Sequence, residues 1–166
     1  MTSEFATAPC TPSRESESAN IRGVRCDLLE DYVCFEYILL GDLSDLLEEP
    51  FDEETRKWMI AVLDALLDTL PQEQELKEKD GGYLSDVLET QPNWWAHVDQ
   101  LRAEHDDLFM TLKVLRFDIE NNDTESRAAT EARLRLQDWM LSLQAHHRHE
   151  TRLIQSALIF EVGGGD

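Results

Sequence analysis

The clearest indication of the fold lies in residues 132–157, ARLRLQDWMLSLQAHHRHETRLIQSA. Alternating steps of four and three residues through this stretch reach eight positions, which is the spacing of a helix that packs against other helices. Six of these positions are apolar, and the other two are His146 and Glu150, one helical turn apart. Because a buried imidazole or carboxylate is costly unless it is paired or bound to a metal, this pair is a candidate for metal ligation.

The segment before it, residues 93–120, has the same spacing. Alternating steps from Trp94 to Ile119 again reach eight positions, of which seven are apolar and one is His105. We expect a helix here with Asn93 as its N-cap, because asparagine is a favoured cap residue. Both helices interrupt an apolar seam with a metal-ligand residue type, and a site between facing helices of a bundle would explain both interruptions.

Two further helices are expected in the first half of the chain. The first covers residues 25–48 and carries Glu36 among its inward leucines. The second covers residues 52–79, and its inward stripe ends in Gln74 and Glu78. All four helices therefore carry a polar residue in or beside the inward stripe.

Proline, glycine and cap residues mark where the second helix begins, bends and ends. Asp52 is expected to cap its N-terminus, and Pro71 is expected to kink or restart it, because proline has no N–H to donate. The paired Gly81 and Gly82 permit a left-handed turn at its end. Trp58, near its start, is expected to point into the core.

The pattern of helices predicts the fold class. A fourth helix is expected over residues 125–160, and no segment shows the alternation of a half-buried strand. Four long helices joined by short links predict an all-α, antiparallel up-down four-helix bundle. Residues 1–22 are rich in Ser, Thr, Pro and Glu and lack any period, so they are predicted to be a disordered tail before a bundle domain of residues 23–166.

The chain is strongly acidic. Its 166 residues include 15 Lys and Arg against 35 Asp and Glu, which gives a formal net charge of −20. This charge repels phosphate backbones and anionic lipids and attracts cations, so neither a nucleic acid nor a membrane is expected as a partner. The longest apolar run, residues 58–63, is far shorter than the roughly 20 residues of a membrane helix. With three cysteines and no secretory signal pattern, the sequence predicts a cytoplasmic protein.

Two motifs in the second half resemble those of a known family. They are Glu104-His105-Asp106-Asp107-Leu108 and, about forty residues later, His146-His147-Arg148-His149-Glu150-Thr151-Arg152-Leu153. The pattern is similar to that of the hemerythrin-like (HHE cation-binding) domain family, in which one helix carries a single His and the next a His-x-x-x-Glu pair. The resemblance implies an up-down four-helix bundle that binds non-haem iron through His105, His146 and Glu150, and it makes dioxygen a candidate partner of the ion.

The first half departs from the family pattern, in which the same unit occurs twice. Gln74 stands where the second helix should supply a His, Glu78 keeps the carboxylate, and Glu36 takes the place of the lone His of the first helix. The ligand set implied for one or two iron ions is therefore His105, His146, Glu150, Glu78 and Glu36. The other histidines, His97, His147 and His149, are expected to lie outside this set.

These observations leave two alternative functions from different classes. The first is a non-haem metal (iron) binding protein for oxygen, redox or metal sensing or storage. The second is a metal-free four-helix bundle that acts as an interaction or regulatory module, in which Gln74 and Glu36 would hydrogen-bond to His105 and His146. No enzymatic activity is expected, because the sequence has no Gly-rich phosphate loop, nucleophile elbow or thiolate zinc spacing. It does not identify a protein partner.

Overall fold

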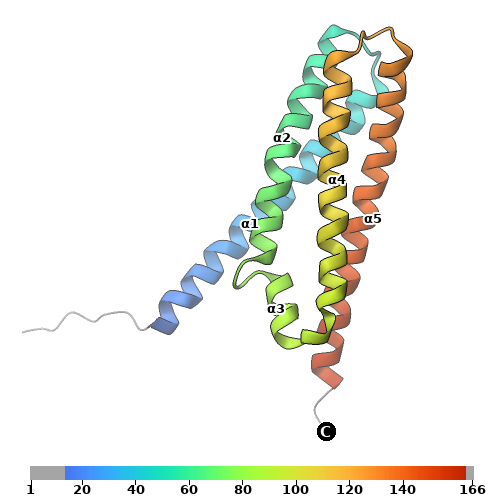
Figure 1. The fold of residues 1–166 in the computed structure, drawn as a ribbon. Helices are drawn as coiled ribbons and strands as arrows, with labels where there is room; N and C mark the ends of the chain where they lie inside the picture. The colour runs from blue at the N-terminus through green and yellow to red at the C-terminus, as the bar shows by residue number, and fades with distance from the viewer. Residues whose placement is uncertain (1–13, 164–166) are drawn as a thin grey trace, which may run out of the picture.

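The computed structural model describes the backbone of residues 14–163 and the side chains of residues 23–24, 27–157 and 159. This part of the chain contains helices and no strand. The elements are α1 (Arg14–Glu48), α2 (Glu53–Glu78), α3 (Tyr83–Thr90), the 3-10 turn η1 (Pro92–Trp94), α4 (Trp95–Asn121) and α5 (Arg127–Gly163). The long helices α1, α2, α4 and α5 run alternately up and down (Figure 1), so the predicted all-α four-helix bundle is confirmed.

The helices pack as two antiparallel pairs. α1 packs mainly against α2, and α4 mainly against α5, while contacts between α2 and α4 join the two pairs. The short α3 lies at the lower end of the bundle in Figure 1, against α2, α4 and α5. The N-terminal half of α1 leaves the bundle toward that same end, so α1 packs through its C-terminal half. No helix in the described part of the chain is long and apolar enough to cross a membrane.

Two apolar clusters form the core. The larger draws on all four long helices, and the smaller joins α3 to the adjacent ends of α4 and α5. The predicted seams supply both: all eight seam positions of α5 are buried, as are six of the eight from Trp94 to Ile119. Trp139 donates from its indole Nε1 to the Leu108 carbonyl at 2.9 Å, so its polar group is satisfied inside the core.

The turn between α2 and α3 depends on two glycines. Gly81 has a φ of 86°, in the left-handed region that favours glycine. At Gly82, a Cβ atom would lie 2.3 Å from the carbonyl oxygens of both Leu76 and Lys77. No side chain fits there unless the last turn of α2 moves, so this close approach fixes where α3 begins.

The first helix begins earlier than the sequence predicts. α1 starts at Arg14, so residues 14–22, which were expected in the disordered tail, are helical. Arg and Glu, which recur in this stretch, are good helix formers and lead directly into the apolar part of the helix. The rest of the predicted tail, residues 1–13, lies outside the described residues.

The second helix confirms its predicted cap and passes through its proline. The Asp52 carboxylate accepts hydrogen bonds from two backbone N–H groups of the first turn, at 3.0 and 2.8 Å. α2 continues through Pro71 to Glu78, so the helix does not restart at the proline, and the alternative of a kink there stays a prediction. The buried side chains of Leu70 and Glu73 flank the proline and hold both neighbouring turns in the bundle.

Two predictions about individual residues are wrong. The N-cap of α4 is Trp94 rather than Asn93, because Pro92 starts a separate 3-10 turn before the helix. Trp58 is 61% exposed, and the next residue, Met59, fills the core in its place.

Gly82→Ala is expected to destabilise the protein by about 1–3 kcal/mol, because the new Cβ meets backbone oxygens that cannot move aside. Gly41→Ala is the matched control. Gly41 lies inside α1, where a Cβ meets nothing within 4 Å, so this change should add about 0.5–1 kcal/mol of stability. Urea unfolding followed by circular dichroism measures both, and equal effects would show that the turn has room for a side chain.

Candidate functional site

A layer of buried polar side chains separates the two apolar clusters of the core. Its members, here called the polar layer, are Glu36 of α1, Glu73 and Lys77 of α2, His105 of α4, and His146 and Glu150 of α5. Each is between 2% and 8% exposed. A charged group at this depth is strongly destabilising unless it has a partner, so the contacts within the layer decide what it can do.

Lys77 is the cation of the polar layer. Its Nζ contacts Glu73 Oε1 and lies 3.1 Å from Glu150 Oε2. Burial alone would lower the pKa of Lys77, but the Glu150 and Glu73 carboxylates outweigh it and the pKa is raised, so the amine stays charged. The two carboxylates are held together by one ammonium group.

Tyr83 completes this ion pair from the start of α3. Its hydroxyl donates a hydrogen bond to Glu150 Oε1 at 2.6 Å, and its ring centroid lies 5.9 Å from the Lys77 Nζ. Burial, together with the Glu150 carboxylate, raises the pKa of Tyr83, so the hydroxyl keeps its proton and remains a donor. Both Glu150 oxygens therefore have a partner.

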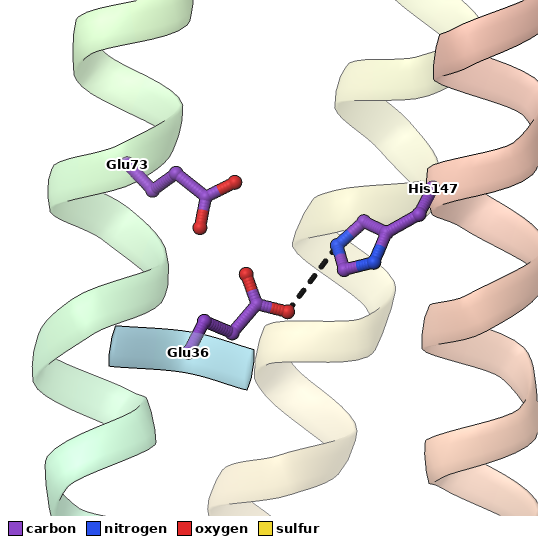
Figure 2. A group of neighbouring side chains, drawn as sticks. All are labelled: Glu36, Glu73 and His147. Atoms are coloured by element: carbon purple, nitrogen blue, oxygen red, sulfur yellow. Dashed lines mark ion pairs between the residues drawn. The ribbon is translucent and has the colours of Figure 1, made fainter. Parts of the chain in front are cut away.

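A second group, here called the trio, consists of Glu36, Glu73 and His147. The two glutamates belong to the polar layer, and the histidine lies beside it. Figure 2 shows the three side chains turned toward one another from α1, α2 and α5. The Nε2 atom of His147 lies 3.3 Å from Glu36 Oε1, and one candidate ligand atom from each residue lies within 4.8 Å of the other two. Among the described residues this is the one group of three or more His, Cys, Asp or Glu side chains with that geometry.

The three residues of the trio differ in the direction of their pKa shifts and therefore in protonation. Burial raises the pKa of Glu36 to about 9, and the hydrogen bond and charge of Glu73 add to the effect. Burial would also raise the pKa of Glu73, but the hydrogen bond with Glu36 and the charge of Lys77 outweigh it and the pKa is lowered. Burial and the nearby Lys77 lower the pKa of His147. At neutral pH the trio therefore contains a carboxylic acid, a carboxylate and a neutral imidazole.

Two buried oxygens of the trio lack a hydrogen-bond donor. These are Glu36 Oε1 and Glu73 Oε2. A buried acceptor without a donor costs about 1–3 kcal/mol, and native proteins contain few of them. In the metal-free protein the proton of Glu36 is shared with Glu73, so these two oxygens would both be satisfied only when a cation replaces that proton or a further donor enters.

A cavity of about 320 Å³ opens onto the trio, between α1, α2, α5 and Tyr83. We call it the α1–α5 pocket. Its inner end is polar and includes Lys77 and Glu150, and its mouth is lined by apolar parts of Val33, Tyr37, Leu40 and Ile154. All three residues of the trio line this pocket.

His105 and His146 form a third group, with ring centroids 6.2 Å apart, and the His146 ring lies 6.0 Å from the His147 ring of the trio. The Nδ1 atoms of His146 and His149 both lie 3.2 Å from the same oxygen of Glu104, which accepts from them. Burial and the neighbouring His146 lower the pKa of His105. The Nε2 atoms of His105 and His146 are both buried without a partner.

The structure does not bring the five predicted ligands to one point. Glu36 lies in the trio, Glu150 is bound by Lys77 and Tyr83, and His105 lies beside His146. Glu78 pairs with Arg102 at 3.1 Å and accepts a hydrogen bond from Gln74. That these five residues hold a metal stays a prediction. Among the described residues, Gln74 and Glu36 do not form the hydrogen bonds to His105 and His146 expected for the metal-free alternative: Gln74 donates to Glu78, and Glu36 lies beside His147.

Two residues of the trio, Glu73 and His147, are absent from the predicted set. Alternating steps of three and four from Leu63 reach Leu66, Leu70, Glu73 and Lys77, all of which are buried. The predicted stripe passed through Leu67 instead and ended on Gln74 and Glu78, which are only partly buried. Strict alternation along α2 is thus the signal that identifies Glu73 and Lys77. No comparable signal marks His147, which lies one position beside the α5 seam.

Comparisons of the chain with protein-family models, curated proteins and solved structures give no match. The resemblance to the hemerythrin-like family therefore stays a prediction that rests on the two motifs.

Lys77→Met is expected to destabilise the protein by about 3–5 kcal/mol, because it leaves Glu73 and Glu150 buried without their cation. Lys79→Met is the matched control. Lys79 pairs with Glu75 one turn away, but both side chains are about half exposed, so its loss should cost less than about 1 kcal/mol. Denaturant unfolding of both variants tests this, and similar losses would mean that Lys77 is not the cation on which the layer depends.

Glu36 should make the metal-free protein less stable as the pH rises. Its pKa is about 9 in the folded protein against an ordinary value of 4.5, so above pH 4.5 the unfolded chain loses a proton that the folded state keeps. The stabilisation from this proton is complete below pH 4.5 and is lost as the pH rises toward 9, by up to about 1.4 kcal/mol per unit.

Glu36→Gln removes this titration. The variant should therefore gain stability relative to the wild type between pH 5 and about 9, as measured by urea unfolding in the presence of a chelator. Glu30→Gln, an exposed position of the same helix, controls for the loss of a surface charge. Parallel pH profiles for the wild type and Glu36→Gln would contradict the prediction.

Proposed function

We propose that this protein is a metal-binding four-helix bundle that holds one divalent first-row transition-metal ion with Glu36, Glu73 and His147. The observation that carries the proposal is a pair of buried carboxyl oxygens without donors beside a neutral imidazole. Two ligands about 2.1 Å from one ion lie about 3.0–3.4 Å apart, and the Glu36–His147 separation of 3.3 Å is in that range.

The charge of the site supports a divalent ion. When an ion displaces the proton of Glu36, the trio carries two negative charges, which a divalent ion balances. Lys77 already neutralises Glu150, so the rest of the layer adds no net charge. The net charge of −20 on the whole chain also attracts cations toward the pocket.

The contacts of Lys77 with Glu73 and Glu150 also indicate that the site holds one metal ion rather than two. A second ion would need ligands on the far side of Glu73, and there the Lys77 ammonium contacts Glu73 and Glu150. Lys77 thus supplies the positive charge that a second metal ion would otherwise bring. Carboxylate oxygens remain for one ion on the side of Glu36 and His147.

Iron is the first metal to test. A mixed set of imidazole and carboxylate ligands suits Fe²⁺, Mn²⁺ and Zn²⁺, and the resemblance to the hemerythrin-like family favours iron among them. Three protein ligands leave coordination positions open toward the pocket, where a bound ion would act as a Lewis acid or take dioxygen. A role in oxygen, redox or metal sensing or storage belongs to the same proposal. So does a cytoplasmic location, which the unpaired, exposed thiol of Cys34 supports.

A metal-free bundle that serves as an interaction module is the second candidate. It is favoured by Lys77, because this residue already gives the polar layer a cation of its own. The two candidates differ in what should occupy the two unsatisfied oxygens of the trio.

Titration of metal-free protein with Fe²⁺ under anaerobic conditions, and with Zn²⁺, is expected to give one ion per chain by calorimetry. Glu73→Gln and His147→Ala should each weaken binding by about 100-fold or more, because each removes a ligand. Glu75→Gln and His149→Ala are matched controls, since they are exposed neighbours on the same two helices and should leave the affinity unchanged.

Three outcomes of this titration would contradict the trio. If His105→Ala and Glu150→Ala abolish binding while Glu73→Gln and His147→Ala do not, the ligands are those implied by the family resemblance. If two ions bind, Lys77 does not replace one of them. If folded protein binds no ion above background, the metal-free alternative holds.

A further inference from the structure

The α1–α5 pocket is larger than a metal ion requires. Its volume of about 320 Å³ is at the lower end of the range for small-molecule sites. At about 30 Å³ for each water-sized group, it has room for about ten heavy atoms. An ion and its water ligands would fill only the inner end.

The mouth of the pocket is apolar, which a metal site alone does not explain. Val33, Leu40 and Tyr37 approach it from α1, and Ile154 from α5. Val33 is 46% exposed and Tyr37 is 79% exposed, because α1 leaves the bundle here and packs little against α5. Apolar walls beside a polar floor are the arrangement that binds a molecule with one polar end and one apolar end.

The chemistry of the inner end selects the polar head group. Lys77 directs two of its three N–H groups at Glu150 and Glu73, and the Tyr83 hydroxyl donates to Glu150, so at most one of these N–H groups remains for an incoming molecule. The free groups are the oxygens and imidazole of the trio, which the metal ion would occupy. With so few protein donors, a head group at the floor would bind the ion itself, and a carboxylate oxygen is among the ligands that such ions accept.

We propose that the α1–α5 pocket binds a medium-chain carboxylate, with its head group on the metal ion and its apolar chain between α1 and α5. This inference rests on the proposed metal site and extends it by naming the class of ligand. The chain length follows from the volume, which accommodates about seven carbons beside the ion and a head group of two oxygens, close to the eight carbons of octanoate.

The test is calorimetric titration of the full-length, metal-loaded protein with acetate, hexanoate and octanoate. Affinity should rise about fourfold for each methylene that enters the pocket, so octanoate should bind about 15-fold more tightly than hexanoate. Val33→Asn should weaken octanoate binding about fivefold and leave metal affinity unchanged, because Val33 lines the mouth and is not a ligand. Val114→Asn is the matched control, since Val114 is 48% exposed on α4 and lies outside the pocket.

The outcomes separate this proposal from the metal site. Metal content is measured before the carboxylate is added, and protein that cannot be loaded with metal refutes the proposed function itself. With normal metal content, the pocket proposal is overturned by affinities that do not depend on chain length or by equal effects of Val33→Asn and Val114→Asn. Octanoate binding of equal strength to metal-free protein would overturn the assignment of the head group to the ion.

Discussion

The structure depends on the Lys77 ammonium that lies between Glu73 and Glu150. Three charged groups at this depth would each be strongly destabilising alone, and the layer tolerates them because each charge has an opposite charge in contact. Tyr83 satisfies the remaining oxygen of Glu150, and it reaches that oxygen because the chain turns tightly at Gly82. A backbone feature at the end of α2 thus supports a charge balance in the middle of the bundle.

The polar layer also explains why the core is divided. Leucine-rich packing holds the four long helices together on one side, and a smaller cluster around α3 closes the other end. Between them lie polar side chains that contact one another, several of their atoms are unsatisfied, and a cavity opens between α1 and α5. Such an arrangement is expected where a protein gives up some stability for a site.

The sequence predicted the seams of α4 and α5 because alternating steps of three and four residues reach mostly apolar positions along the whole length of each helix. The sequence did not determine in the same way which face of α2 points into the core. One possible stripe of inward residues passes through Leu66 and the other through Leu67, so both are apolar as far as Leu70. They differ in chemistry only beyond it, where one contains Glu73 and the other Gln74. Packing against α1 and α4 selects the stripe that buries Glu73 and Lys77. The candidate site was missed at these positions for that reason.

The sequence by itself determined that the chain forms helices, that they pack as a bundle, and that acidic and imidazole groups interrupt the seams. Periodicity and charge are local properties, and they can be counted along the chain. Only the tertiary structure decided that Glu36 meets Glu73 and His147, that Glu150 is held by Lys77, and that His105 lies beside His146. Which side chains meet depends on the rotation and spacing of helices far apart in sequence, and these follow from the packing of the whole core.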